Sequence, residues 1–168
     1  VIMGGLHVTA LPDEASQHAD SIIIGEAEIS WPALLHDLLA DKLQPVYDCS
    51  DESFDLSKSP MPRFDLLDVD KYNRLTVQTQ RGCPWDCEFC AASMRLAPFK
   101  MKPVAKVISE IERISNLYGE NFVEFADDNT FANRKHSIKL LDALAKTNVR
   151  FFAESDLSIA DDPELLWR

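Results

Sequence analysis

The chain has 168 residues, 46% of them hydrophobic and 27% charged, which is the composition of a globular protein and excludes a disordered or fibrous one. Its 17 Lys and Arg against 28 Asp and Glu give a formal net charge of −11 at pH 7, so we expect no nucleic acid and no anionic membrane surface as partner, because both attract cations. No apolar run approaches the roughly 18 residues that a membrane-spanning helix needs.

Residues 1–42 read as two short units of strand followed by helix. The expected strands are Val1–Met3 and Ser21–Ile24, and the expected helices are Asp13–His18 and Trp31–Leu39, opened by Pro12 and Ser30. Short, almost continuously apolar strands that alternate with helices indicate a parallel sheet covered on both faces.

Small or acidic residues follow each of these two strands: Gly4 and Gly5 after the first, Gly25 and Glu26 after the second. Open α/β sheets bind ligands at the carboxyl ends of their strands, so these four positions are candidate ligand contacts. A tight turn or close packing explains such glycines at least as often as a ligand does.

Residues 43–72 are predicted to be a linker, because they contain three prolines and many Asp and Ser residues without apolar periodicity. We expect Phe64, Leu66 and Leu67 to pack the linker onto one of the flanking domains. The single Cys49 is expected to be a spectator, since an isolated free cysteine usually behaves as a small hydrophobic residue.

Residues 73–168 repeat a pattern of strand and helix. The expected elements are strand Leu75–Gln80, helix Pro103–Tyr118, strand Asn121–Ala126, helix Arg134–Lys146, strand Val149–Ala153 and a helix start at Pro163 with Asp162 as N-cap. In a β/α barrel the functional groups sit at the carboxyl ends of the strands. By that rule Asp127, Asp128 and Glu154 open on one face together with the loop that follows the first of these strands.

That loop, Arg81–Cys90, carries three of the four cysteines in the spacing C-x3-C-x2-C: Cys83, Cys87 and Cys90. Thiolates select zinc, copper(I) or iron–sulfur clusters, and a structural zinc site normally takes four protein ligands. The loop offers three and no histidine lies near it, which favours a cluster with one open iron over structural zinc. Clustered cysteines of this kind also indicate a metal-binding protein of the reducing cytoplasm and not a disulfide framework.

Basic residues cluster around this loop: Arg81, Arg95, Lys100, Lys102 and Lys106. They either compensate the charge of thiolates and a bound carboxylate or form an ordinary solvated face.

The cysteine spacing, with the aromatic Phe89 before the last cysteine and a strand before the loop, resembles the radical S-adenosylmethionine (radical SAM) enzymes. The resemblance implies a [4Fe–4S] cluster on Cys83, Cys87 and Cys90, whose open iron is chelated by S-adenosyl-L-methionine, and a 5′-deoxyadenosyl radical formed by reductive cleavage. It also implies that Phe89, Asp127, Asp128 and Glu154 lie at the cofactor. No residue is assigned a catalytic role of its own.

Residues 1–72 resemble the segments that precede the barrel in the cobalamin-binding subclass of these enzymes. The matching runs are Gly-Gly-x-His-Val-Thr-Ala-Leu-Pro, Ile-Ile-Ile-Gly-Glu-Ala-Glu, Trp-Pro-x-Leu-Leu and Met-Pro-Arg-Phe-Asp-Leu-Leu-Asp. The resemblance implies that Gly4, Gly5, Gly25 and Glu26 contact cobalamin.

The resulting expectation is an α/β fragment in three parts. Residues 1–42 end a Rossmann-like cobalamin-binding domain, residues 43–72 link it onward, and residues 73–168 form the N-terminal half of a partial (β/α)6 radical SAM barrel. The implied function is a cytoplasmic radical SAM enzyme of a subclass that often methylates unactivated carbon, acting on a small molecule with an external electron donor. We expect the fragment alone to be inactive. A radical SAM enzyme without cobalamin, and a non-catalytic iron–sulfur module, stay open as alternatives.

Overall fold

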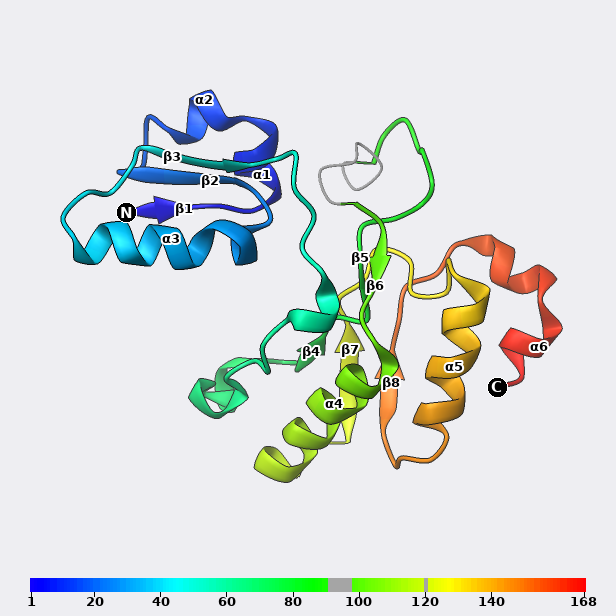
Figure 1. The fold of residues 1–168 in the computed structure, drawn as a ribbon. Coiled ribbons are helices and arrows are strands. Elements are labelled where there is room, and N and C mark those ends of the chain that lie inside the picture. Colours follow the sequence, from blue (N-terminus) through cyan, green and yellow to red (C-terminus); the bar gives the residue numbers. More distant parts are fainter. Residues whose placement is uncertain (91–97, 120) are drawn as a thin grey trace. The chain divides into compact units, whose positions relative to one another are not determined.

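The computed structural model describes residues 1–90, 98–119 and 121–168. The chain divides into two compact units (Figure 1). The first unit comprises Val1–Ser59 and the segment Asp86–Pro98, and the second comprises Pro60–Trp85 and Phe99–Arg168. The α/β class with parallel sheets, expected from the alternation of strands and helices, is confirmed.

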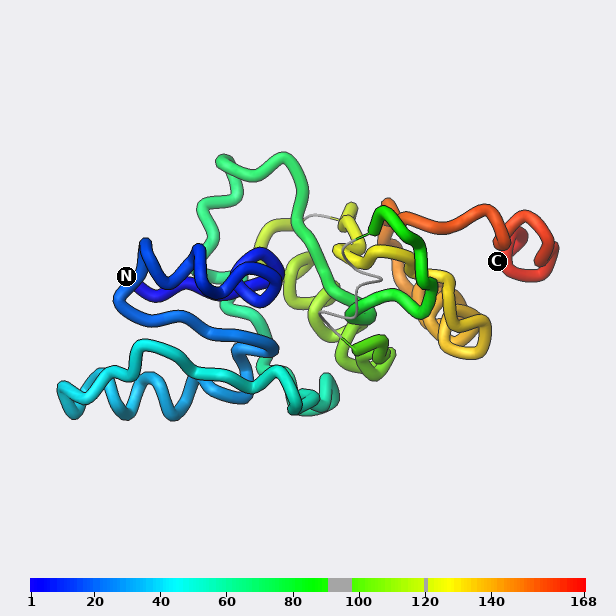
Figure 2. The backbone as a smooth tube through the Cα atoms, turned by 90° about the horizontal axis from the view of Figure 1, so that it is seen from above, coloured from blue at the N-terminus to red at the C-terminus, as the bar shows by residue number. Residues whose placement is uncertain are grey.

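The first unit is built on a parallel sheet in the order β1-β2-β3. The strands are β1 (Ile2–Met3), β2 (Ser21–Gly25) and β3 (Val46–Cys49). The helices α1 (Leu6–Ala10) and α2 (Pro12–Ala15) connect β1 to β2, and α3 (Ala27–Leu39) connects β2 to β3, a path that can be followed in Figure 2. Val8, Ala15 and Ile22 form the small core beneath α1 and α2.

Three sequence expectations for this unit are corrected. The expected helix Asp13–His18 is the shorter α2, and α1 was not predicted. Helix α3 begins at Ala27 and not at Trp31, so Pro32 lies inside the helix and removes one backbone hydrogen bond without marking the helix start. The predicted linker contains β3, which pairs with β2 from Ile22↔Val46 to Gly25↔Cys49. This strand was missed because it has only four residues, directly follows Pro45 and includes a charged residue.

The second unit holds a parallel sheet in the order β4-β7-β8, with strands β4 (Thr76–Val77), β7 (Phe122–Phe125) and β8 (Arg150–Phe152). Helix α4 (Val104–Tyr118) connects β4 to β7, and α5 (Arg134–Leu144) connects β7 to β8. Because successive right-handed crossovers in one direction put their helices on the same face, α4 and α5 should be neighbours, and they pack against each other.

A short antiparallel pair, β5 (Gln80–Arg81) with β6 (Lys100–Met101), lies between β4 and α4 in the sequence. The expected single strand Leu75–Gln80 is therefore broken into β4 and β5. Single 3-10 turns and a terminal helix complete the unit: η2 (Phe64–Leu66), η3 (Val69–Lys71), η4 (Leu157–Asp161) and α6 (Pro163–Leu166); the first unit has η1 (Leu56–Lys58).

The core of the second unit lies between its sheet and the helices α4 and α5. Helix α4 contributes Val107, Ile111 and Ile114, the apolar stripe expected from its sequence, and ends at Gly119, whose φ of 69° gives the left-handed cap. Phe125 and Phe151 stack across neighbouring strands with ring centroids 4.9 Å apart.

The segment that leads into the second unit packs onto this core. Phe64 is buried there and Leu67 is packed against it, as expected, whereas Leu66 is 71% exposed. The Tyr118 hydroxyl donates to the carbonyl oxygens of Phe64 and Leu67 and so ties the segment to the end of α4. Within the described residues, no helix is long and apolar enough to cross a membrane.

Candidate functional site

The two segments that flank the cysteine loop in the sequence pair with each other in the second unit. At its base Gln80 pairs with Met101 and Arg81 with Lys100 in the β5–β6 ladder. One residue further on, the Lys102 backbone N–H donates to the Thr79 carbonyl at 2.8 Å. The two stems of the loop are therefore held together immediately after the first strand of the sheet.

The cysteines of the loop have the chemistry of a metal-binding set. None is in a disulfide; Cys87 is exposed, and Cys83 and Cys90 are partly exposed. The Cys90 backbone N–H donates to the Cys87 carbonyl at 3.1 Å, so the chain between the last two cysteines forms a turn. Phe89, which lies in this turn, is 93% exposed. Three accessible thiols with no competing disulfide fit an iron–sulfur cluster as donor set.

Among the residues that the structure describes, no group of three His, Cys, Asp or Glu side chains is placed to hold a metal ion. The cluster therefore stays a prediction from the cysteine spacing.

Cys49 differs from the other three cysteines. It is 3% exposed, and its thiol donates to the carbonyl oxygens of Ile24 at 3.0 Å and Glu26 at 3.3 Å. Burial raises the pKa of the Cys49 thiol, so it stays protonated and unreactive. The buried environment agrees with its expected role as a spectator.

Asp127, which follows β7, is 6% exposed and already fully engaged with the chain's own donors. Its Oδ1 accepts from the backbone N–H groups of Thr79 at 2.8 Å and Gln80 at 3.1 Å. Its Oδ2 accepts from the hydroxyls of Thr79 at 2.5 Å and Thr130 at 3.2 Å. Burial raises the pKa of this carboxyl against the opposing effect of these hydrogen bonds. Asp127 thus clamps the strand end that leads into the cysteine loop.

Asp128 and Glu154 contrast with Asp127, because both are exposed. They follow neighbouring strands, β7 and β8, and the Thr130 backbone N–H donates to the Glu154 carbonyl at 3.0 Å, which joins the two strand ends. Of the acidic residues expected at this edge, these two have side chains accessible to a ligand.

A second hydrogen-bond network extends from the same edge to the cysteine loop. Asn129, 3% exposed, donates from Nδ2 to Asp156 Oδ2 at 2.5 Å, and its carbonyl accepts from the Gln80 amide. Asp156 Oδ2 also accepts from the Trp85 indole at 2.7 Å. This contact could not be predicted from the sequence, because 71 positions separate its two residues.

Lys102, one of the basic residues expected around the loop, is paired with an acidic residue inside the fold. The Lys102 ammonium lies 2.9 Å from both carboxylate oxygens of Glu110 on α4, and both side chains are buried. Its charge is therefore compensated inside the fold and does not face the thiolates. Arg95 lies outside the described residues.

In the first unit, the four candidate ligand contacts fall into two kinds. Gly4 and Gly5 are exposed, and an added Cβ at Gly5 would meet no atom within 4 Å, so the backbone there is approachable. Gly25 has φ 87°, and its α-carbon packs so closely on Cys49 that a Cβ would lie 2.9 Å from the carbonyl. Glu26 is buried and accepts from the Phe54 N–H at 2.8 Å. Gly25 and Glu26 therefore have structural roles in the first unit.

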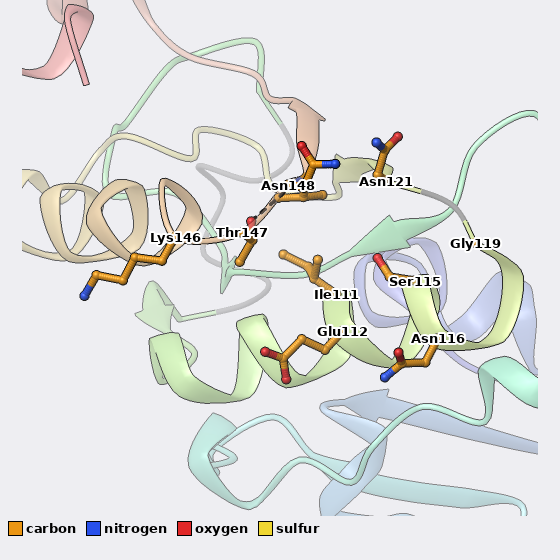
Figure 3. Close-up of a pocket in the computed structure, with 10 residues that line it drawn as sticks. Ile111, Glu112, Ser115, Asn116, Gly119, Asn121, Lys146, Thr147 and Asn148 are labelled. Carbon is orange, nitrogen blue, oxygen red and sulfur yellow. Dashed lines mark hydrogen bonds between the residues drawn. The ribbon is translucent and has the colours of Figure 1, made fainter.

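A pocket of about 600 Å³ lies in the second unit (Figure 3). It is lined by the end of α4 and by the residues that precede β7 and β8, including Ser115, Asn116, Asn121, Thr147 and Asn148. These positions are at the amino ends of the strands, the stability face of a β/α architecture, and not at the carboxyl ends where its active sites lie.

Curated proteins resemble the chain along almost its whole length. It is 32% identical to an uncharacterized methyltransferase of Synechocystis, covering 99% of this chain and 32% of the relative. It is 31% identical to the bacteriochlorophyllide d C-12(1)-methyltransferase of Chlorobaculum tepidum, covering 98% and 38%. It is 30% identical to the hopanoid C-2 methylase of Rhodopseudomonas palustris, covering 99% and 33%. The chain thus spans about a third of the length of these relatives.

A solved structure shares the fold. The cobalamin-dependent S-adenosylmethionine radical enzyme OxsB, solved with aqua-cobalamin and S-adenosylmethionine bound, superposes with a TM-score of 0.69 at 19% sequence identity. The match covers 89% of this chain and 25% of that one. No family model matches the chain.

Proposed function

Because the chain belongs to the cobalamin-binding radical SAM enzymes, we propose that the full-length gene product uses a [4Fe–4S] cluster and S-adenosyl-L-methionine to methylate an unactivated carbon of a small molecule. The observation that carries the proposal is the loop with three accessible, disulfide-free cysteines, placed directly after the first strand of a parallel β/α sheet. The relatives named as methyltransferases favour methyl transfer over other radical reactions.

Cys83, Cys87 and Cys90 would hold the cluster, which when bound supplies the electron for reductive cleavage of the sulfonium. Three ligands leave one coordination position for the cofactor, unlike the sets of four in electron-transfer proteins. The hydrogen bonds to Thr79 and Lys102 fix the two stems from which the loop emerges. The chain's contribution is therefore to present three thiolates from a fixed base.

We assign the methionyl ammonium of the cofactor to the exposed carboxylates Asp128 and Glu154, since acceptors suit a cation. Asp127 contributes indirectly, by holding Thr79 and Gln80 in place. Phe89, exposed beside the last cysteine, offers an aromatic face to the cofactor.

For cobalamin we favour Gly4 and Gly5, whose exposed backbone leaves room for a bulky ligand at the carboxyl end of β1. Gly25 and Glu26 shape the neighbouring strand end, where their contacts to Cys49 and Phe54 set the course of the chain. The four cysteines without disulfides suit the reducing cytoplasm, and an external electron donor completes the expected partners.

Anaerobic reconstitution separates the enzyme from a non-catalytic iron–sulfur module. The full-length gene product, reconstituted with iron and sulfide and reduced with dithionite, should form 5′-deoxyadenosine and methionine from S-adenosyl-L-methionine. Cys87→Ala should form neither. A wild-type protein with an intact cluster that leaves S-adenosyl-L-methionine uncleaved would reject radical chemistry and leave the electron-transfer alternative.

A further inference from the structure

Trp85 lies between the first two cysteines, and its side chain is tied to the end of another strand. The indole Nε1 donates to Asp156 Oδ2 at 2.7 Å, and Asp156 follows β8. The ring is 48% exposed, so apolar burial alone does not fix it. The hydrogen bond is therefore a specific restraint on this part of the loop.

Asp156 is built as a strong acceptor. Its Oδ2 takes the indole N–H and the Asn129 amide, and its Oδ1 takes the Ser158 backbone N–H at 2.7 Å. Hydrogen bonds from Ser158 first, then from Asn129 and Trp85, lower the pKa of Asp156 to about 2. The carboxylate is accordingly an anion at neutral pH, and charge-assisted hydrogen bonds are about twice as strong as neutral ones.

The acceptor is also anchored. Asn129 is buried and accepts from the side chain of Gln80, which is 1% exposed and belongs to β5. Gln80, Asn129 and Asp156 thus connect the ends of β5, β7 and β8 in one chain of hydrogen bonds. Trp85 attaches the cysteine loop to that chain four residues beyond its stem at Arg81.

We propose that Trp85 and Asp156 are a positioning pair that holds the first part of the cysteine loop at the end of β8 and so sets the cluster against the bound cofactor. This inference rests on the proposed function. Misplacement of a reacting group by about 1 Å can cost two orders of magnitude in rate, so a restraint within the ligand loop acts on the chemical step more than on cofactor binding.

A purely local role for Asp156 must be separated from this one. Its Oδ1 caps the 3-10 helix η4 through Ser158, an interaction that does not involve Trp85. Asp55 caps η1 in the same way, accepting from the Ser57 N–H at 2.9 Å. Trp167, 89% exposed, provides a matched tryptophan. Asp55→Ala and Trp167→Phe therefore control for loss of a cap and loss of an indole.

The test compares 5′-deoxyadenosine formation by the reconstituted full-length gene product and its variants. It also compares amide hydrogen exchange of residues 82–90 in the metal-free protein, which should be faster in Trp85→Phe and Asp156→Ala than in wild type, because the restraint on the loop is lost. Trp85→Phe and Asp156→Ala should each lower kcat about tenfold, with the KM for S-adenosyl-L-methionine within about twofold of wild type. The double variant should be no slower than the slower single one. Asp55→Ala and Trp167→Phe should leave kcat unchanged.

Three kinetic results would overturn the pairing: an unchanged kcat in Trp85→Phe, multiplication of the two single effects in the double variant, or a rise in KM without a fall in kcat. Unchanged hydrogen exchange of residues 82–90 in both single variants would overturn it as well. These outcomes differ from failure of the proposed function, in which the wild-type protein itself forms no 5′-deoxyadenosine.

Discussion

At the scale of single residues, the adjacent carboxylates Asp127 and Asp128 at the end of β7 differ in burial and therefore in role. Asp127 is buried and accepts four hydrogen bonds from Thr79, Gln80 and Thr130, whereas Asp128 is exposed. The sequence motif does not distinguish between the two residues. The fold makes the first a structural clamp and leaves the second for a ligand.

Asn substitutions at these two positions should therefore separate stability from cofactor binding. Asp127→Asn replaces one acceptor oxygen by a donor facing N–H or O–H groups, and should lower the free energy of unfolding by about 1.5–3 kcal/mol. Asp128→Asn should change that free energy by less than about 0.5 kcal/mol and weaken binding of S-adenosyl-L-methionine by about tenfold. Urea denaturation and equilibrium dialysis measure the two effects. Equal destabilisation by both substitutions would contradict the division.

At the scale of elements, the base of the cysteine loop depends on a buried ion pair that joins it to α4. Lys102 and Glu110 are 2.9 Å apart with 5% and 3% of their side chains exposed. Breaking a buried pair leaves an uncompensated charge and typically costs about 3–5 kcal/mol, whereas replacing both partners by apolar residues is often neutral.

Lys102→Met should thus destabilise the second unit by about 3 kcal/mol, and Lys102→Met with Glu110→Met should recover most of that loss. The matched control is Arg63→Met, which breaks the ion pair of Arg63 with Asp65, where the arginine side chain is largely exposed. This change should lower the free energy of unfolding by less than about 1 kcal/mol. Denaturant unfolding curves give the three values. A double variant as unstable as Lys102→Met alone would show that the pair's charge balance is not what matters.

Sequence pattern predicted the elements whose signals are local. The apolar stripe of α4, its end at Gly119 and the Asp162 cap of α6 all appear in the structure. Strand β3 was not predicted, because the segment is short and partly polar and becomes a strand only by pairing with β2 in the folded unit. The break between β4 and β5 depends on the antiparallel partner β6, which lies on the far side of the cysteine loop.

The candidate site follows the same rule. The thiol spacing marks the loop by itself, since three soft ligands within eight residues have few other uses. The Trp85–Asp156 bond was not predictable, because it joins residues whose proximity exists only after the strands have aligned. The Lys102–Glu110 pair joins residues eight positions apart, and its burial comes from packing. The burial that distinguishes Asp127 from Asp128 likewise comes from packing and not from the strand-end position that they share.

At the scale of the whole molecule, the chain combines two parallel sheets in separate compact units and spans about a third of its curated relatives. Both units present polar or glycine positions at the carboxyl ends of their strands: Gly4 and Gly5 in one, Asp128 and Glu154 in the other. This arrangement fits the proposal of cobalamin at the first sheet and S-adenosyl-L-methionine at the second. We propose that Cys83, Cys87 and Cys90 alone hold the cluster.

Iron and sulfide content of the reconstituted full-length gene product and its cysteine variants tests that proposal most directly. The wild-type protein and Cys49→Ala should each retain about four iron and four sulfide ions with the broad absorbance of a [4Fe–4S] cluster. Alanine at Cys83, Cys87 or Cys90 should abolish that absorbance. Loss of the cluster in Cys49→Ala, with retention in Cys90→Ala, would contradict the account.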